Sequence, residues 1–347
     1  MSKPFKIAID DGSTNVKVSW ITNKTLKSVI SPNSFRKDWK SAALLRGKQI
    51  YNYEIGINKY TYDPTSEKSL STTHIDYQYG DLNLLAVHHA LLQTGLPPCD
   101  VAITVTLPIT EYYQQEDCQR NEANIERKKQ NLMRAINLNK GEVFNIVSVD
   151  VMPESLPAVL TRLMNSGVNP YTKTLVIDCG GTTLDMGLIV GEFDEISEVY
   201  GNRALGVSLV TDAARTALAA ADSDSSYLVA NELIKHRHDL NFVHEVINDE
   251  SQIPKILEKI ERKVEELGHF VADEAKKFAR NPNRIYLVGG GACLIYPAIQ
   301  RTYPTLGERV ILIEESQSAL SREICLYISD EEEIYSETPV QLEVGND

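Results

Sequence analysis

Apolar positions along the chain follow two periods, and these predict strands and helices in turn. Short apolar runs rich in branched side chains occur at residues 5–10 and 16–21, and again at 174–190, which is typical of strand hairpins. Residues 254–280 instead carry apolar side chains at helical spacing, which predicts a long amphipathic helix. The other predicted elements are strands at 101–107, 143–151, 195–200 and 284–288, and helices at 82–92, 122–137, 157–165, 206–221, 227–237 and after residue 292. Strands that alternate with helices predict layers of the α/β class.

The chain divides into two parts of domain size. A length of 347 residues is typical of about two domains. The stretch Gly167-Val-Asn-Pro170 interrupts the pattern and separates an N-terminal lobe (1–167) from a C-terminal lobe (168–329). Within the first lobe, residues at about 30–80 are rich in Tyr, Ser, Asn and Lys and predict a small insertion of short strands and loops. The acidic, aperiodic residues 330–347 predict a mobile tail.

One kind of turn occurs twice, half a chain apart. Asp10-Asp11-Gly12-Ser13-Thr14-Asn15 and Asp178-Cys179-Gly180-Gly181-Thr182-Thr183 each follow an apolar strand and precede a returning one. A carboxylate beside small residues brings a metal-attracting group next to backbone N–H groups that can surround phosphate. Either turn alone also fits an ordinary tight hairpin. Their joint occurrence favours two halves that close on one nucleotide, with Asp11 and Asp178 at a Mg²⁺ ion, in part through water.

Two further segments have candidate chemistry. Gly289-Gly290-Gly291 follows the buried strand 284–288, so a flat ligand could lie on its backbone, although a tight strand–helix connection explains it as well. Glu154 follows Pro153 at a strand end, where a carboxylate could orient or deprotonate water that attacks a γ-phosphate. Alone, such a glutamate also fits a favourable charge near a helix start.

Composition and motif searches exclude several classes. There is no G-x-x-x-x-G-K-[ST] and no G-x-G-x-x-G, so the P-loop and dinucleotide-binding fingerprints are absent. A net charge of −13 argues against extensive direct contact with DNA and favours contact through a basic partner. The five scattered cysteines exclude a disulfide framework and a zinc site of standard spacing. No apolar run approaches membrane-spanning length and no signal core is evident, so we expect a cytoplasmic protein without membrane contact. The basic cluster Arg127-Lys128-Lys129 predicts a solvated helix face.

Together these residues resemble the actin/Hsp70/hexokinase ATPase superfamily, and within it the plasmid-segregation actins of the ParM (StbA) family. The matching stretches run in order to about residue 320. They are Asp10–Asn15, Ile30-Ser-Pro-Asn-Ser-Phe35, Ala86-Val-His-His-Ala-Leu-Leu92, Leu107-Pro-Ile-Thr-Glu-Tyr-Tyr113, Asn124-Ile-Glu-Arg-Lys-Lys129, Val151-Met-Pro-Glu-Ser155, Asp178–Asp185, Leu205-Gly-Val-Ser-Leu-Val-Thr211 and Gly289–Ala292. The sequence departs from the family around Ser321–Ile324, where a small Asn-Gly pair is usual.

The resemblance implies an actin-like ATPase fold, with two lobes that each contain a ribonuclease H-like βαβ core around a central nucleotide cleft. ATP or ADP with Mg²⁺ would lie between the lobes. ATP-bound subunits of the family assemble into two-stranded filaments, and slow hydrolysis destabilises them. Filament ends engage an adaptor DNA-binding protein of the ParR type bound to a centromere-like site, so that DNA is contacted only indirectly and plasmid copies are pushed apart.

The resemblance also implies roles for individual residues. Glu154 would act on the attacking water, with Asp11 and Asp178 at the metal. The expected nucleotide-binding residues are Gly12, Ser13, Thr14, Asn15, Lys17, Gly180, Gly181, Thr182, Thr183, Glu232, Lys235, Gly289, Gly290 and Gly291, with Glu232 and Lys235 facing ribose and base.

Two other functions use the same fold. A small-metabolite kinase needs a catalytic Asp that activates a hydroxyl, whereas Glu154 occupies the corresponding loop here. An Hsp70-type chaperone needs a peptide-binding domain, for which this length leaves no room. The filament-forming ATPase is the leading hypothesis.

Overall fold

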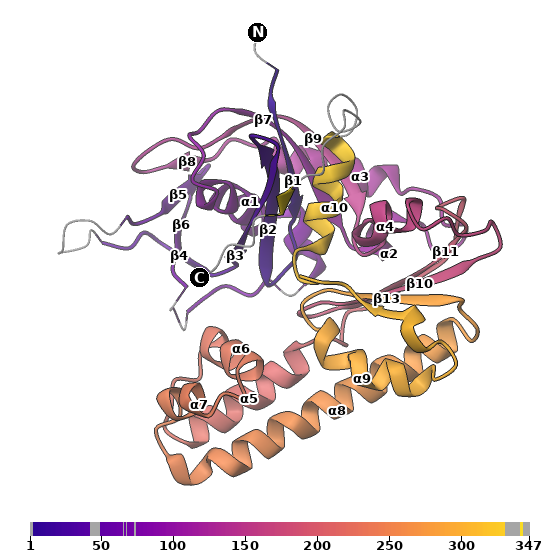
Figure 1. Cartoon of the computed structure of the whole chain (residues 1–347). Helices are drawn as coiled ribbons and strands as arrows, with labels where there is room; N and C mark the ends of the chain where they lie inside the picture. The colour runs from indigo at the N-terminus through magenta and orange to yellow at the C-terminus, as the bar shows by residue number, and fades with distance from the viewer. Residues whose placement is uncertain are drawn as a thin grey trace.

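The computed structural model describes residues 3–41, 49–64, 66, 68–72, 74–329 and 341–342, which form two lobes. In Figure 1 the first lobe, in indigo and purple, lies above the helices of the second lobe, in salmon and orange. Apart from residues 341–342, the predicted mobile tail lies outside the described residues, as do parts of the predicted insertion.

A six-stranded sheet is the centre of the first lobe. Its strand order is β15-β3-β2-β1-β7-β9. The strands are β1 (Phe5–Asp10), β2 (Asn15–Thr22), β3 (Thr25–Pro32), β7 (Asp100–Leu107), β9 (Asn145–Pro153) and β15 (Gln341–Leu342). β1, β2 and β3 form an antiparallel meander, and β7 and β9 continue the sheet parallel to β1. The hairpin predicted at residues 5–10 and 16–21 is thus confirmed.

The sheet of the second lobe repeats this plan. Its order is β12-β11-β10-β13-β14, again an antiparallel meander followed by two parallel strands. The strands are β10 (Lys173–Cys179), β11 (Leu184–Val190), β12 (Glu195–Asn202), β13 (Arg284–Val288) and β14 (Val310–Leu312). In both lobes the Asp-containing turn joins the first two strands of the meander. The repeated turn in the sequence therefore reflects a repeated sheet.

A small third sheet comes mainly from the segment where an insertion is predicted. Its order is β4-β6-β5-β8, from β4 (Phe35–Lys37), β5 (Asn52–Ile55), β6 (Asn58–Tyr62) and β8 (Asn137–Leu138).

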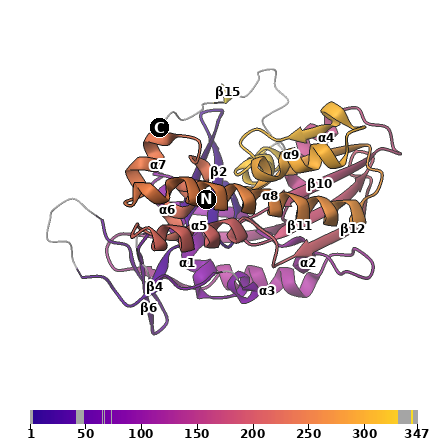
Figure 2. The same ribbon diagram turned by 90° about the horizontal axis from the view of Figure 1, so that it is seen from below.

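Helices cover both faces of the first sheet and the outer face of the second. On the first sheet they are α1 (Asp81–Gln93), α3 (Glu122–Leu132) and α10 (Ala319–Ser329); on the second, α5 (Ser208–Ala220), α8 (Ile253–Phe278) and α9 (Ala292–Thr302). Helix α6 (Tyr227–Lys235) packs on α5, and α7 (Leu240–Val246) packs on α6. Helix α8 packs against α5 and α9 and crosses the underside of its lobe (Figure 2). The short elements are α2 (Ile109–Tyr112), α4 (Leu160–Met164) and the 3₁₀ turns at Ile75–Tyr79, Leu156–Val159, Glu250–Gln252 and Gly307–Arg309. None of the helices in the described part of the chain is long and apolar enough to cross a membrane.

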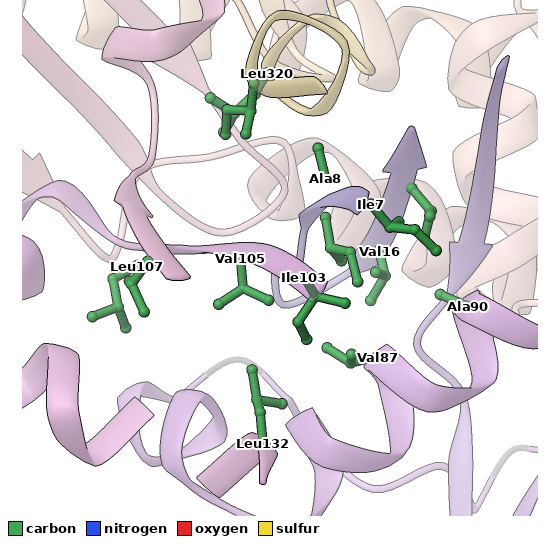
Figure 3. Packing of buried hydrophobic residues seen from close by; sticks show 14 of the residues in the cluster. Ile7, Ala8, Val16, Val87, Ala90, Ile103, Val105, Leu107, Leu132 and Leu320 are labelled. Atoms are coloured by element: carbon green, nitrogen blue, oxygen red, sulfur yellow. The ribbon is translucent and has the colours of Figure 1, made fainter. Parts of the chain in front are cut away.

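The chain returns to the first lobe at its end, which the sequence does not predict. The prediction assigns residues 168–329 to the second lobe, but α10 packs on β1 and β2. Figure 3 shows Leu320 of α10 on the side of Ala8, while Val87 of α1 lies on the opposite side of the sheet. The first sheet is thus buried on both faces, as its continuous apolar strands require.

In strand β10, successive side chains alternate between the core of the second lobe and the side that faces the first lobe. Leu175 and Ile177 belong to the core beneath α5 and α8, whereas Val176 joins the core of the first lobe. Successive side chains of a strand point to opposite faces. Asp178 and its cross-strand partner Asp185 therefore face the first lobe.

If α10 belongs to the core of the first lobe, truncation of its buried face must destabilise the fold. Ile324 is fully buried against that core. We expect Ile324→Ala to lower the free energy of unfolding by about 2–5 kcal/mol, through lost burial and a cavity. Urea denaturation tests this. Tyr327→Ala on the same helix is the control, because Tyr327 is 49% exposed. Equal stability of the two variants would contradict the packing of α10.

Candidate functional site

A cavity of about 1220 Å³ lies between the two lobes. Most of the predicted site residues line it: Gly12, Ser13, Thr14, Asn15, Lys17, Glu154, Asp178, Gly180, Gly181, Thr182, Thr183, Glu232, Lys235, Gly289 and Gly290. Asp11 and Gly291 are predicted site residues that do not line it. The fold thus brings together residues from Gly12 to Gly290, most of a chain length apart.

The two Asp-containing turns touch each other at the cavity. The hydroxyls of Ser13 and Thr182 lie 2.9 Å apart in a hydrogen bond. A Cβ atom on Gly181 would lie 2.6 Å from Thr14, so only glycine fits this approach. The turns of the two lobes therefore form one continuous surface.

The first turn presents its amide groups to the cavity because its carbonyl groups are bonded elsewhere. Asn33 Nδ2 donates to the carbonyl oxygens of Gly12 and Ser13, both at 2.9 Å, and Asn33 N–H donates to Thr14 O at 2.9 Å. Among the described residues, no acceptor takes the N–H groups of Gly12, Ser13 or Thr14. Such a row of free amides is an anion-binding feature.

The second turn is held by the start of helix α5. Val207 N–H donates to Gly180 O at 3.1 Å, and Ser208 N–H donates to Gly181 O at 2.7 Å. Because these bonds dock the turn on a helix N-terminus, the helix dipole adds to its attraction for anions.

The neighbouring aspartates of the first turn lie in different environments. Asp10 lines the cavity, and its carboxylate pairs with Lys17 Nζ at 2.9 Å. Burial acts to lower the pKa of Lys17, but the adjacent Asp10 outweighs it and the pKa is raised. Asp11 is fully buried away from the cavity, where its carboxylate accepts from Asn83 Nδ2 at 2.6 Å and from Thr106 N–H at 3.0 Å. The structure therefore places Asp10, not Asp11, at the cavity.

Lys128 of α3 pairs with Asp11 behind the turn. Its ammonium group contacts the carboxylate of Asp11 and Gln78 Oε1, and donates to Asn83 Oδ1 at 3.0 Å. Both charged side chains of the pair have no exposed surface. The prediction that residues 127–129 form a solvated face is wrong for Lys128. Its partners come from three separate segments, so no local sequence signal could reveal the pair.

Three carboxyl groups, those of Asp178, Asp185 and Glu154, line the cavity and affect one another's pKa. Burial, and then the charge of Asp10, raise the pKa of Asp178 to about 6. Burial, and then Asp178, raise the pKa of Asp185 to about 7. Burial and the charges of Asp185, Asp10 and Asp178 raise the pKa of Glu154 well above its usual value. Asp185 is a site residue that the sequence analysis does not predict. Asp178 and Asp185 lie at opposite positions on the two strands of one predicted hairpin, and this pairing could have indicated that their side chains share a face.

These residues fit a hydrated Mg²⁺ ion. The available donors are carboxylate and hydroxyl oxygens, the ligands that Mg²⁺ prefers, and concentrated negative charge attracts a cation. Over the residues that the structure describes, no group of three or more His, Cys, Asp or Glu side chains could hold a metal directly.

The three glycines Gly289, Gly290 and Gly291 differ in their relation to the cavity, because only the first two line it. Gly289 has φ +86°, and a Cβ there would lie 2.1 Å from Asp178 Oδ1. A Cβ on Gly291 would lie 2.6 Å from Cys179 Sγ, so this glycine allows strand–helix packing rather than ligand contact. Gly290 has no such neighbour and is open to the cavity. Farther along the wall, Glu232 and Lys235 form an ion pair at 2.8 Å.

A second contact joins the lobes beside the carboxylates. Arg203, just after β12, pairs with Glu111 of α2 at 2.5 Å. Glu111 is held in turn by the Tyr79 hydroxyl at 3.0 Å and by Asn124 Nδ2 at 3.2 Å. This pair and the contact between the two turns thus both link the lobes at the cavity.

Two protein-family models match the chain. The model for "Plasmid segregation protein ParM, N-terminal" matches residues 5–165, and the model for "Plasmid segregation protein ParM, C-terminal" matches residues 168–327. Among curated proteins, the chain is 26% identical over 222 residues to a chaperone protein DnaK of Metamycoplasma hominis, across 59% of this chain. It spans only 34% of that relative's length.

Solved structures confirm the predicted actin-like fold. An archaeal actin homologue superposes with a TM-score of 0.68 at 17% identity, covering 93% of this chain and 99% of that one. A crystal structure of the same homologue in complex with ADP gives 0.64 at 16% identity, with coverage of 93% and 99%. A 15-stranded ParM filament from Clostridium botulinum gives 0.67 at 17% identity, with coverage of 94% and 99%.

Removal of the buried cation behind the first turn should destabilise the protein strongly. We expect Lys128→Met to cost about 3–5 kcal/mol of unfolding free energy, because Asp11 is left as an uncompensated buried charge. Adding Asp11→Asn to this variant should restore much of the loss. Urea denaturation of both single variants and the double variant gives the coupling energy. Lys129→Met is the matched control, because the neighbouring Lys129 side chain is 34% exposed. A cost no larger than that of the control would show that the buried pair is unimportant.

The raised pKa values of the cavity carboxyls predict a pH-dependent stability. A carboxyl group whose pKa is higher when folded binds its proton more tightly in the folded state. Its stabilisation is complete below the ordinary pKa of 3.8 and is lost as pH rises through about 6 for Asp178 and about 7 for Asp185. Asp185→Asn cannot ionise, so the nucleotide-free variant should be more stable than the wild type at pH 8, with a difference that shrinks toward pH 4. Urea denaturation across this range tests the sign, with the exposed Asp150→Asn as control. No gain at pH 8 would contradict it.

Proposed function

Because the chain belongs to the ParM family of plasmid-segregation proteins, we propose that it binds ATP and Mg²⁺ between its lobes and assembles into filaments that its own slow ATP hydrolysis takes apart. The observation that carries the proposal is the meeting of the two Asp-containing turns at one cavity, where Ser13 contacts Thr182. Each turn joins the first two strands of a repeated meander, and both turns line the same cavity.

The phosphate groups would lie between the two turns. The free N–H groups of Gly12, Ser13 and Thr14 face phosphate from the first lobe, and the turn from Gly180 to Thr183 faces it from the second. Lys17 adds an ammonium group at the cavity wall. The negatively charged triphosphate would thus be surrounded by donors from both lobes.

Asp10 and Asp178 would hold the Mg²⁺ ion through water, with Asp10 in place of the Asp11 expected from the sequence. One carboxylate comes from each lobe, and both line the cavity. When bound, the ion neutralises phosphate charge and favours the ionised form of the surrounding carboxyl groups. Asp11 has a different role, since with Lys128 it fixes the turn from behind.

Glu154 would orient the attacking water and accept its proton. It lies at the carboxyl end of β9 and lines the cavity close to Asp185, Asp10 and Asp178, which raise its pKa. A base of raised pKa accepts a proton readily once it is ionised. The adenosine would lie at the other end of the cavity, on the open backbone of Gly290 and beside Glu232 and Lys235.

Self-assembly and the contact with DNA follow from the family. We propose two-stranded filaments of this chain in the cytoplasm, with an adaptor of the ParR type that binds the centromere-like site. The net charge of −13 supports indirect contact with DNA. A small-metabolite kinase is not favoured, because both family models belong to segregation proteins.

Sedimentation and hydrolysis together test the proposal. With Mg²⁺ and ATP, the purified protein should form polymer that sediments and then disassembles as phosphate is released. Glu154→Gln should slow hydrolysis about 100-fold or more, the usual cost of losing a general base, and should leave polymer that persists. Glu122→Gln is the control, because the Glu122 side chain is 72% exposed. Absence of polymer across a wide concentration range would refute the filament, and unchanged hydrolysis in Glu154→Gln would remove Glu154 from this role.

A further inference from the structure

The residue after Glu154 has a strained backbone. Ser155 has φ 72° and ψ −66°, and Leu156 N–H donates to Glu154 O at 2.9 Å across it. This is a γ-turn of the positive-φ form, which is rare and costly for a residue other than glycine. It turns the chain sharply directly after Glu154.

The γ-turn is wedged between the lobes and cannot relax alone. Leu156 is buried and packs on β11 of the second lobe, where a Cβ on Gly187 would lie 2.3 Å from Leu156 Cδ2. The 3₁₀ turn that follows, Leu156–Val159, packs against α10. The strained conformation is therefore fixed by packing on both sides.

The Ser155 hydroxyl is buried without a protein partner. Ser155 has no exposed surface, and among the described residues no group forms a hydrogen bond with its Oγ. Buried hydroxyls are rarely left in that state. Asp178 is its neighbour: burial raises the pKa of Asp178, and donation from the Ser155 hydroxyl, although outside normal hydrogen-bond geometry, opposes this rise. The unpartnered donor thus lies beside the carboxylate that the second lobe contributes to the cavity.

We propose that Ser155 is a positioning residue for ATP hydrolysis, and that in the nucleotide-bound protein its hydroxyl donates a hydrogen bond of normal geometry to the Asp178 carboxylate. This rests on the proposed function. Glu154 and Ser155 are adjacent in the first lobe and Asp178 belongs to the second. The bond fixes Asp178, the carboxylate proposed at the metal, relative to Glu154, the carboxylate proposed at the attacking water, so hydrolysis depends on the Ser155 hydroxyl.

Two substitutions separate the hydroxyl from the strain of the turn. Ser155→Ala removes the hydroxyl and keeps a side chain in the left-handed region, so its thermal stability should stay close to that of the wild type. Ser155→Gly removes the hydroxyl and also relieves the strain, so it should be at least as stable. Thr174→Val is the matched control, because Thr174 on β10 also has a buried hydroxyl without a partner and does not line the cavity.

The experiment measures binding of a fluorescent ATP analogue as Mg²⁺ is titrated, and single-turnover ATP hydrolysis, on full-length protein. Both Ser155 variants should bind the analogue without Mg²⁺ as the wild type does. Both should need about 10- to 100-fold more Mg²⁺ to reach half of the Mg²⁺-dependent change in analogue binding. Both should also hydrolyse ATP about 10- to 100-fold more slowly. A loss of this size is usual when a group that orients a metal-binding carboxylate is removed. Thr174→Val should match the wild type in both measurements.

Three results would overturn the inference. Wild-type hydrolysis and Mg²⁺ dependence in Ser155→Ala would show that the hydroxyl has no role. Slow hydrolysis in Ser155→Ala with wild-type hydrolysis in Ser155→Gly would assign the effect to backbone geometry instead. Failure of the wild type itself to bind or hydrolyse ATP would refute the proposed function and this inference with it, and so differs from the first two results.

Discussion

The rest of the structure depends on the direct contact between the two Asp-containing turns. Ser13 and Thr182 meet at 2.9 Å, and Gly181 lies so close to Thr14 that no side chain fits between them. That approach is possible because both turns join the first two strands of the same kind of meander, in two sheets built on one plan. Whatever separates the lobes also separates the amide groups that would surround phosphate.

Charge is arranged around this contact on two sides. Behind the first turn, Lys128 neutralises Asp11 in a fully buried pair and holds the turn in place. In front of it, Asp178, Asp185 and Glu154 face the cavity with raised pKa values, because burial and mutual repulsion disfavour their ionised forms. Behind the turn, the charge of Asp11 is therefore neutralised within the protein. On the cavity side the carboxyl groups repel one another, and the proposed Mg²⁺ ion would offset their charge.

The sequence was sufficient for the features that local patterns encode. Strand and helix periods, the repeated turn and the Gly289 segment predicted the two sheets and a cleft between them. Side-chain direction was harder: Asp10 and Asp11 are adjacent and chemically alike, and only the register of β1 determines that Asp10 faces the cavity. Burial of Lys128 depends on partners from three separate segments. The return of α10 to the first lobe depends on long-range packing against β1 and β2. Helical periodicity within residues 319–329 does not indicate which sheet the helix packs on.

The most direct test of the account is a crystal structure with a non-hydrolysable ATP analogue and Mg²⁺. We predict that the terminal phosphates contact amides of both turns, and that the metal faces Asp10 and Asp178 while Lys128 keeps its pair with Asp11. A metal bound by Asp11 with Lys128 displaced, or a nucleotide that contacts only one of the two turns, would contradict the account.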